Sequence, residues 1–196
     1  MNIYKDIFKL PKAIIFLTDE EKQLVHRIFH NEKKLHDVIG VGIDIPQKVS
    51  EINFRTKYNI NEQFLIYVGR VDVGKNCDEM FKYFIKYKNQ NPESNLKLVI
   101  MGKSIMDIPK HPDIIYLGFV SDEDKYNAVS CARALILPSE YESLSISVLE
   151  SMALATPVLV NGKCAVLKGH CEKSQGGLYY MDFFEFQDKV NELFSY

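Results

Sequence analysis

The chain has 196 residues, of which 46% are hydrophobic and 26% charged, so its composition is that of an ordinary globular protein and not of a disordered one. The net charge of −2, from 24 Lys and Arg against 26 Asp and Glu, lacks the basic excess of a general nucleic-acid-binding protein. At about 150 residues per domain, the length corresponds to one domain and a smaller additional piece.

The sequence also argues against membrane and secreted classes. No apolar run approaches the roughly 18 residues of a transmembrane helix, and the first dozen residues carry charges throughout, unlike a secretory signal. Four scattered cysteines do not suggest a disulfide framework, so we expect a cytoplasmic location. Cys164, His170 and Cys171 form one local cluster, but structural zinc usually has four ligands in tighter pairs, so buried thiols and a surface imidazole are the favoured interpretation.

The first 45 residues predict a βαβ piece. Residues 13–17 form an apolar run typical of a buried strand, and Thr18 and Glu21 have the spacing of a capping box that begins a helix. Apolar residues at helical spacing continue that helix to position 29, and the apolar run 38–43 predicts a second strand. Residues 46–62 are polar, and we expect a linker there with a short helical turn.

Residues 63–196 predict a complete domain. Apolar strands are expected at 64–69, 96–101, 114–117, 134–137 and 157–160. Helices are expected after the first of these strands, from a cap at Ser121 and over 145–154, and an amphipathic helix is expected at the end of the chain around 183–194. This alternation indicates the α/β class, with a doubly wound, Rossmann-like parallel sheet, in which ligands bind at the carboxyl ends of the strands.

The loop after the first of these strands carries two cations. Arg70 and Lys75 flank a turn that contains Gly74, between a strand and a helix, a placement that suits a phosphate or diphosphate. The loop is not a Walker loop, and no Gly-x-Gly-x-x-Gly occurs in the chain. The alternative is a pair of solvated side chains in a turn.

The loop after the fourth strand carries two glutamates. Glu142 lies in the loop and Glu150 eight residues later, among apolar helix residues, so both can face one cleft at different heights. A buried carboxylate needs a partner, and the hydroxyls of a ligand are one candidate. The backbone amides of residues 143–145 add an anion site at the start of the helix. The alternative is a surface glutamate plus a helix glutamate satisfied by an internal lysine or the backbone.

Together these loops resemble the donor-binding domain of the GT-B glycosyltransferases of family 4, the glycosyl transferase group 1 family. The resemblance runs from about residue 64 to the C-terminus and is strongest in the two glutamates separated by seven residues. Pro138-Ser139 precedes this pair and Thr156-Pro157-Val158 follows it, while the family's Gly-Arg…Lys element matches Gly69, Arg70 and Lys75.

The resemblance implies a role for each site residue. Arg70 and Lys75 would hold the diphosphate of a sugar nucleotide, Glu150 the ribose hydroxyls, and Glu142 the donor sugar. Glu142, Arg70 and Lys75 are the expected catalytic residues, since two fixed cations can stabilise the departing diphosphate without a metal ion. The remaining donor-binding residues would be Gly69, the loop of Gly118, Phe119 and Val120 by the base, and Ser143, Leu144 and Ser145, whose backbone would line the sugar and phosphate.

The resemblance also implies retention of configuration, no metal or other cofactor, and a setting in polysaccharide or surface-glycan synthesis. The pieces 1–45, 46–62 and 63–196 would be the end of an acceptor domain, the linker and the donor domain. The partners would then be a nucleotide-diphosphate sugar and a missing N-terminal acceptor domain, with membrane association expected for the full-length enzyme. We expect this chain to be a fragment that is inactive alone.

The sequence departs from the family pattern in places. Ser143 and Ser145 stand where glycines are usual, which narrows the space beside the sugar, and Ala155 replaces a common glycine, which we interpret as a minor packing change. His170 is the only histidine near these loops and is expected to be a surface residue rather than a proton shuttle.

Two other functions remain to be compared. A non-catalytic nucleotide-sugar-binding module would keep the pocket without transfer, although a degenerate site would be expected to lose one of its four charged residues. A nicotinamide-dependent enzyme is disfavoured by the missing glycine fingerprint.

Overall fold

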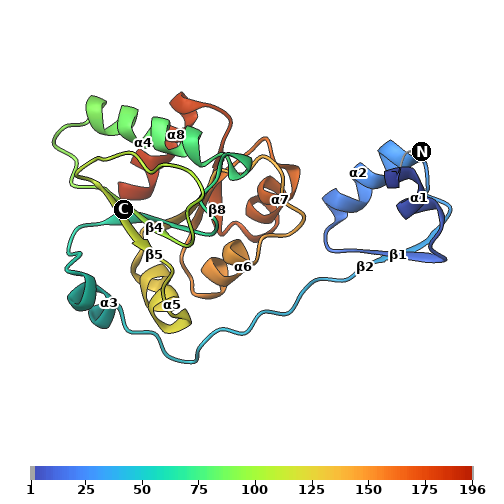
Figure 1. Cartoon of the computed structure of the whole chain (residues 1–196), viewed down its shortest axis with the longest axis horizontal. Coiled ribbons are helices and arrows are strands. Elements are labelled where there is room, and N and C mark those ends of the chain that lie inside the picture. The colour runs from blue at the N-terminus through green and yellow to red at the C-terminus, as the bar shows by residue number, and fades with distance from the viewer. Residues whose placement is uncertain (1–2, 196) are drawn as a thin grey trace.

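The computed structural model describes residues 3–195 and contains two units joined by an extended connection (Figure 1). The first unit comprises α1 (Ile3–Lys9), β1 (Ala13–Phe16), α2 (Asp19–Phe29) and β2 (Leu35–Val38). Strands β1 and β2 form a parallel two-stranded sheet, so the predicted βαβ pattern is present. The prediction that β1 is buried was wrong, because only Phe16 of this strand is buried and Ile15 is 65% exposed. The helix α1 was not predicted.

The capping box of α2 is formed as expected. The Thr18 hydroxyl accepts from the Glu21 amide at 3.2 Å, and the Glu21 carboxylate accepts from the Leu17 amide at 2.8 Å. The second strand, however, lies at Leu35–Val38 and not over 38–43. Its ladder with β1 ends where β1 turns into the cap of α2, so most of the apolar run that follows has no strand to pair with.

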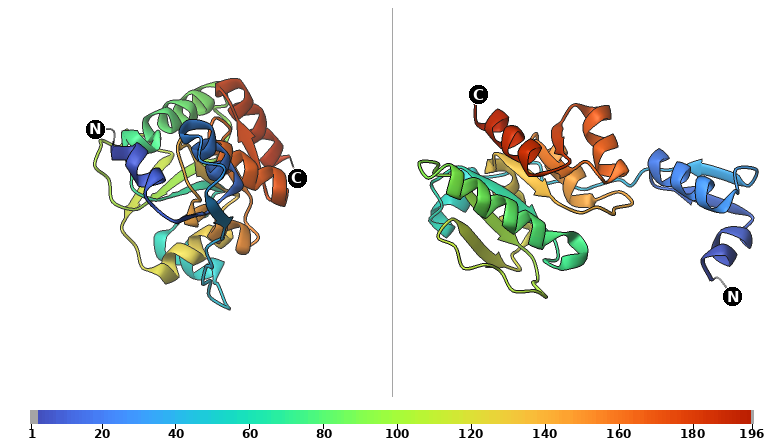
Figure 2. Two further views of the ribbon diagram at one scale, coloured as in Figure 1. Left: turned by 90° about the vertical axis from the view of Figure 1, so that its right-hand side faces the viewer. Right: turned by 90° about the horizontal axis from the view of Figure 1, so that it is seen from above.

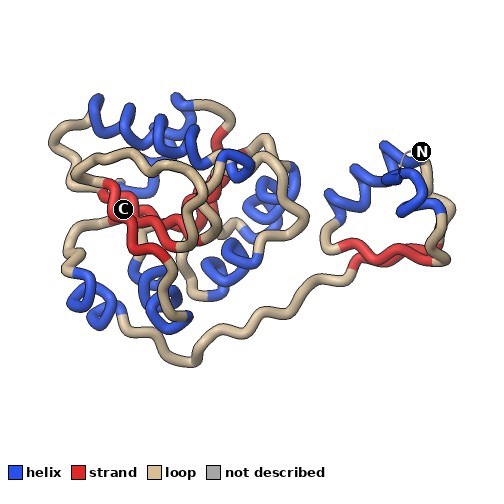
Figure 3. The backbone as a smooth tube through the Cα atoms, viewed as in Figure 1, coloured by secondary structure: helices blue, strands red, loops and turns tan. Residues whose placement is uncertain are grey.

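The chain from residue 39 to residue 49 forms no helix or strand (Figure 3). The predicted helical turn is α3 (Glu51–Tyr58), and it packs on the second unit: Phe54 and Ile60 are buried there, and the Ser50 amide donates to Asn127 Oδ1 at 2.7 Å. The expected linker over 46–62 is therefore an open connection only in its first few residues.

The second unit is built on a six-stranded, fully parallel sheet in the order β5-β4-β3-β6-β7-β8. Its strands are β3 (Phe64–Val68), β4 (Lys97–Met101), β5 (Ile114–Gly118), β6 (Ala134–Leu137), β7 (Val158–Asn161) and β8 (Gly177–Tyr180). Its other helices are η1 (Val73–Lys75, a 3-10 turn), α4 (Cys77–Gln90), α5 (Asp122–Cys131), α6 (Ile146–Ala153), α7 (Ala165–Ser174) and α8 (Phe183–Phe194).

Helices cover both faces of this sheet, which confirms the doubly wound α/β class. Figure 1 shows α4 and α8 on one side of the sheet and α5 and α6 on the other. The central strands β3 and β6 are almost entirely buried, as expected for continuous apolar runs. Neither α7 nor β8 was predicted from the sequence, because their apolar residues are less regularly spaced. No helix among residues 3–195 is long and apolar enough to cross a bilayer.

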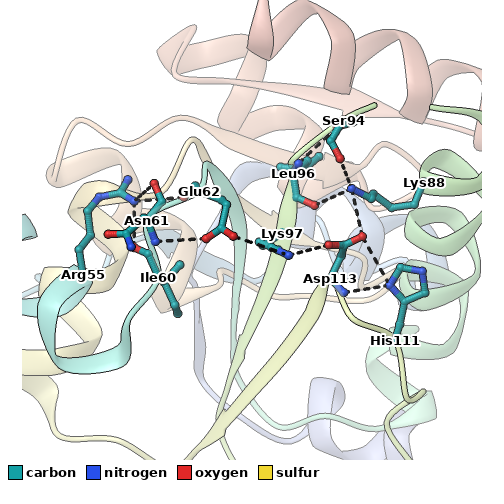
Figure 4. Close-up of polar contacts among 10 residues, drawn as sticks. All are labelled: Arg55, Ile60, Asn61, Glu62, Lys88, Ser94, Leu96, Lys97, His111 and Asp113. Carbon is teal, nitrogen blue, oxygen red and sulfur yellow. Dashed lines mark hydrogen bonds and ion pairs between the residues drawn. The ribbon is translucent and has the colours of Figure 1, made fainter. Parts of the chain in front are cut away.

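An ion-pair network joins residues at the amino ends of β4 and β5 (Figure 4). Lys97 and the buried Lys88 approach the two carboxylate oxygens of Asp113 at 2.7 and 3.1 Å. Burial favours the neutral acid, but the hydrogen bonds from Lys97 and Lys88 outweigh it and lower the pKa of Asp113. This network lies at the end of the strands opposite to the candidate site.

Candidate functional site at the carboxyl edge of the sheet

The strand order has a switch point between β3 and β6. From β3 the chain continues outward to β4, and from β6 it continues in the other direction to β7. The loops that follow β3 and β6 therefore diverge around a crevice, which is where ligands bind in open α/β sheets. These are the two loops that carry the charged residues selected from the sequence.

In the loop after β3, an aspartate organises both cations. Asp72 Oδ1 accepts from the Lys75 amide at 3.0 Å and caps the η1 turn, while Oδ2 accepts from Arg70 Nε. The hydrogen bond from Arg70 lowers the pKa of Asp72, so this carboxyl is ionised at neutral pH. The Arg70 side chain is 61% exposed, and its guanidinium is accessible to a ligand. Asp72 was not selected from the sequence, although an Asp three residues before Lys75 is a recognisable cap.

A close approach of two strand ends holds this loop in place. Gly102, directly after β4, has φ +125, and a Cβ there would lie 2.0 Å from the Gly69 carbonyl oxygen. The Gly69 amide also donates to the Met101 carbonyl at 3.0 Å. The backbone that leads into Arg70 is thus fixed by packing that only glycine allows at position 102.

The two loops meet through an ion pair. Lys75 Nζ lies 2.6 Å from Glu142 Oε1, and Asn76 donates through Nδ2 to the Pro138 carbonyl at 3.2 Å. The Lys75 and Glu142 side chains are 32% and 13% exposed, so the pair lies at the edge of the crevice and not in the core. The structure therefore brings together two of the residues selected from the sequence, 67 positions apart.

Glu150 has partners within the chain. Its Oε1 lies 2.9 Å from both Lys125 Nζ and the Tyr126 hydroxyl, which belong to α5. Burial lowers the pKa of Lys125, but its hydrogen bond to Glu150 outweighs this and the pKa is raised, so the lysine is charged. The internal lysine left open as an alternative is thus present. The Tyr126 hydroxyl is also 3.1 Å from the Asp44 carbonyl, in the extended connection.

Lys125 and Tyr126 are polar residues of the site that sequence reasoning missed. The helix cap at Ser121 was found and is formed, with the Ser121 hydroxyl accepting from the Asp124 amide. The weak amphipathicity of α5 did not indicate which of its residues would face α6.

Two positions at which the chain departs from the glycine of the family pattern have a backbone conformation that favours glycine. Ser145 has φ +71 and Ala155 has φ +58, so both departures from glycine lie in the left-handed region that costs other residues energy. The alanine at position 155 therefore strains the backbone, and our expectation of a minor packing change was wrong.

The loop at Gly118, Phe119 and Val120 stands apart from the charged residues. Gly118 ends β5 with φ +69, its carbonyl accepts from the Gly102 amide at 2.8 Å, and Phe119 is 91% exposed. Strand β5 is two positions from β3 in the sheet. Within residues 3–195, no hydrogen bond or ion pair joins this loop to Arg70, Lys75 or the two glutamates, so its place beside a base stays a prediction.

The cluster near the end of the chain is not arranged as a metal site. Cys164 and Cys171 are buried free thiols, as expected, and His170 Nε2 lies 2.8 Å from the Leu144 carbonyl oxygen. His170 is thus a partly buried residue that contacts the glutamate loop. In the described part of the chain, no group of three or more His, Cys, Asp or Glu is placed to hold a metal ion.

A cavity of about 870 Å³ lies between the first unit and the glutamate loop. Glu142 and Ser143 form part of one wall, and residues of α2 form another. Its lining residues are Glu20, Glu21, Gln23, Leu24, Val25, Arg27, Glu140, Tyr141, Glu142, Ser143, Lys163, Cys164, Ala165 and Val166.

Known proteins share this fold and sequence pattern. An uncharacterized glycosyltransferase of Methanocaldococcus jannaschii is 28% identical over 188 residues, which cover 82% of this chain and 47% of that protein. Sucrose-phosphate synthase from Thermosynechococcus elongatus superimposes with a TM-score of 0.76 at 18% identity, over 97% of this chain and 51% of the other. An E. coli structure described as trehalose-6-phosphate bound with UDP-2-fluoro glucose superimposes with a TM-score of 0.77 at 10% identity, over 100% of this chain and 56% of the other.

These comparisons confirm the fold expected from the resemblance, and the chain spans about half the length of the relatives it matches. The sequence model of glycosyl transferases group 1 matches residues 49–178, which include both loops of the switch point. Since this match covers well over half of the chain, the protein belongs to the glycosyl transferases group 1 family.

Proposed function

We propose that the chain binds a nucleoside diphosphate sugar in the crevice between the loops after β3 and β6, for glycosyl transfer with retention of configuration. The observation that carries this proposal is the Lys75–Glu142 contact of 2.6 Å at the switch point. It joins a cation suited to a diphosphate with a carboxylate suited to sugar hydroxyls, at the sheet edge where such folds bind ligands.

Each charged residue has a role in this proposal. Arg70 and Lys75 hold the diphosphate and stabilise the negative charge that it gains on departure. Glu150 accepts hydrogen bonds from the ribose, and its contact with Lys125 holds the carboxylate in place for that purpose. Glu142 contacts the donor sugar, and Ser143, Leu144 and Ser145 line it with backbone amides. Gly118, Phe119 and Val120 lie by the base.

We further propose that binding requires no metal ion, because the two cations supply the positive charge that a divalent ion supplies elsewhere. The expected result is an unchanged dissociation constant for the nucleotide sugar when EDTA replaces magnesium. An affinity that appears only with magnesium would contradict this part of the proposal.

A second half of the enzyme is proposed to supply the acceptor site. The relatives are about twice as long as this chain, and the first unit exposes apolar residues, with Ile15 65%, Leu35 73% and Leu10 80% exposed. A protein partner or a further domain would cover such a surface. The chain alone is therefore expected to bind the donor without releasing nucleoside diphosphate in the presence of sugar acceptors.

Calorimetric titration with UDP-, GDP- and ADP-sugars tests the donor site. Arg70→Ala and Glu150→Ala should each weaken binding by about tenfold or more, because each removes a charged hydrogen-bonding partner. Lys82→Ala is the matched control, since it removes a cation of α4 that pairs with Asp78. Absence of heat with every donor, or equal affinity in the site variants and the wild type, would refute the proposal.

A non-catalytic binding module is the second candidate, favoured by the Lys125–Glu150 pair that already satisfies the ribose-binding carboxylate. The two functions differ in turnover once an acceptor half is supplied. Transfer by that assembly, lost in Glu142→Gln, would support the enzyme.

A further inference from the structure

The glutamate loop between β6 and α6 has backbone amides without partners. Among residues 3–195, neither the Leu144 nor the Ser145 amide donates a hydrogen bond, and Ser145 provides no side-chain cap for α6. Ser145 also has the left-handed φ of +71 described above. A loop with a strained residue and free amides keeps one conformation only when other groups hold it.

Two side chains hold the loop through its carbonyl groups. The Thr18 hydroxyl donates to the Ser143 carbonyl at 3.3 Å, and His170 Nε2 lies 2.8 Å from the Leu144 carbonyl. Since a carbonyl only accepts, His170 must carry a proton on Nε2. The two carbonyl groups are consecutive in the chain, so both peptide planes that follow Ser143 are fixed from outside the loop.

The geometry of the peptide bond transmits this restraint to the amides. In a trans peptide the C=O and the following N–H point in opposite directions, and the structure contains no cis peptide bond in its described part. The carbonyl that points to Thr18 therefore turns the Leu144 amide the other way, and the carbonyl that points to His170 does the same for the Ser145 amide. Both amides are therefore held away from hydrogen-bond acceptors within residues 3–195.

Thr18 belongs to the first unit, so the loop is held across the boundary between the units. Its hydroxyl is fixed because it also accepts from the Glu21 amide, as the cap of α2. The contact between α2 and α7 maintains this arrangement: Lys173 Nζ lies 2.7 Å from Glu20 Oε1, and a Cβ on Gly169 would lie 2.5 Å from the same oxygen. Figure 2 shows α7 at the end of the second unit that is nearest to the first.

We infer that Thr18 and His170 are positioning residues, which orient the Leu144 and Ser145 amides toward the anionic donor and make donor affinity depend on docking of the first unit. This inference rests on the proposed donor site. Neither residue need touch the ligand: each acts through the peptide plane that it holds. The first unit thereby contributes to donor binding.

The test compares substitutions that remove the donated hydrogen bond with ones that keep it. Thr18→Val and His170→Leu should each misorient one backbone amide and so raise the dissociation constant of the nucleoside diphosphate sugar by about tenfold, the usual effect of losing one hydrogen bond between an amide and a charged ligand. Thr18→Ser and His170→Gln retain an O–H or N–H donor and should restore most of the affinity. Ser50→Ala is the matched control, since it removes the cap of another helix, far from the loop in sequence.

A measurement without ligand separates this inference from the proposed function. The ¹⁵N order parameters of the Leu144 and Ser145 amides should fall in Thr18→Val and His170→Leu, but not in Thr18→Ser, His170→Gln or Ser50→Ala. Urea unfolding identifies which variants remain folded. If the wild type binds no nucleotide sugar, the proposed function fails and the order parameters alone decide the positioning roles. Order parameters unchanged in both disruptive variants, or no rescue by the conservative ones, would overturn the inference.

Discussion

Glu142→Gln should strengthen the binding of a nucleoside diphosphate that lacks the sugar. In the structure the Lys75 ammonium is held 2.6 Å from Glu142 Oε1, and a diphosphate must compete with this carboxylate for the same cation. Glutamine retains a hydrogen-bond acceptor for Lys75 but removes the competing charge. The substitution therefore leaves Lys75 free to interact with the phosphates.

The size of this effect follows from the geometry. Two unit charges about 4 Å apart attract by about 4 kcal/mol at an effective dielectric constant of about 20. The Lys75 side chain is 32% exposed, and such exposure reduces the contribution to roughly 1–2 kcal/mol. Glu142→Gln should accordingly lower the dissociation constant of the nucleoside diphosphate by about 5- to 30-fold.

Calorimetry with the matching diphosphate and its sugar conjugate provides the assay. The sugar conjugate should gain less than the free diphosphate, because its contact with the Glu142 carboxylate is lost. Glu140→Gln is the control: it makes the same change in the same loop, but its carboxylate pairs with Lys163. A diphosphate that binds Glu142→Gln no better than the wild type would refute the competition between carboxylate and ligand.

Three further predictions concern stability, measured by urea unfolding. Asp113→Asn should destabilise the protein by about 2–4 kcal/mol at pH 7, because it leaves the buried Lys88 without a charged partner. Since the pKa of Asp113 is lowered in the folded protein, the difference in stability between wild type and variant should persist above about pH 4 and vanish at lower pH. A difference that does not change with pH would contradict the ion pair. Ala155→Gly should stabilise the protein by about 0.5–1 kcal/mol, because glycine adopts the positive φ of this position without strain. The control Ala153→Gly lies in a helix and should destabilise the protein. If both substitutions changed the stability in the same direction, the strain at Ala155 would be refuted. Phe54→Ala should cost about 3–5 kcal/mol because its ring is fully buried, while a cost below about 0.5 kcal/mol would mean that α3 is part of a loose linker.

Local sequence signals located most elements of this fold, although α1, α7 and β8 were not predicted. The capping box of Thr18 and Glu21, the serine cap of α5 and the apolar runs of the central strands each act within a few residues, so they are visible without tertiary structure. The predicted position of β2 was wrong by a few residues. The end of this strand is set by its pairing with β1, which the apolar pattern alone does not specify.

The two charged loops were also found from the sequence, since parallel strands place their carboxyl ends at one edge of the sheet. Their partners were decided only by tertiary packing. Lys75 meets Glu142 across 67 positions, Lys125 meets Glu150 from a neighbouring helix, and Thr18 reaches the Ser143 carbonyl across 125 positions. Such contacts depend on how each helix is rotated about its axis and on how the first unit docks, and a periodic pattern in the sequence specifies neither. The sequence therefore determined which loops carry the charges, and the packed structure determined which groups hold them in place.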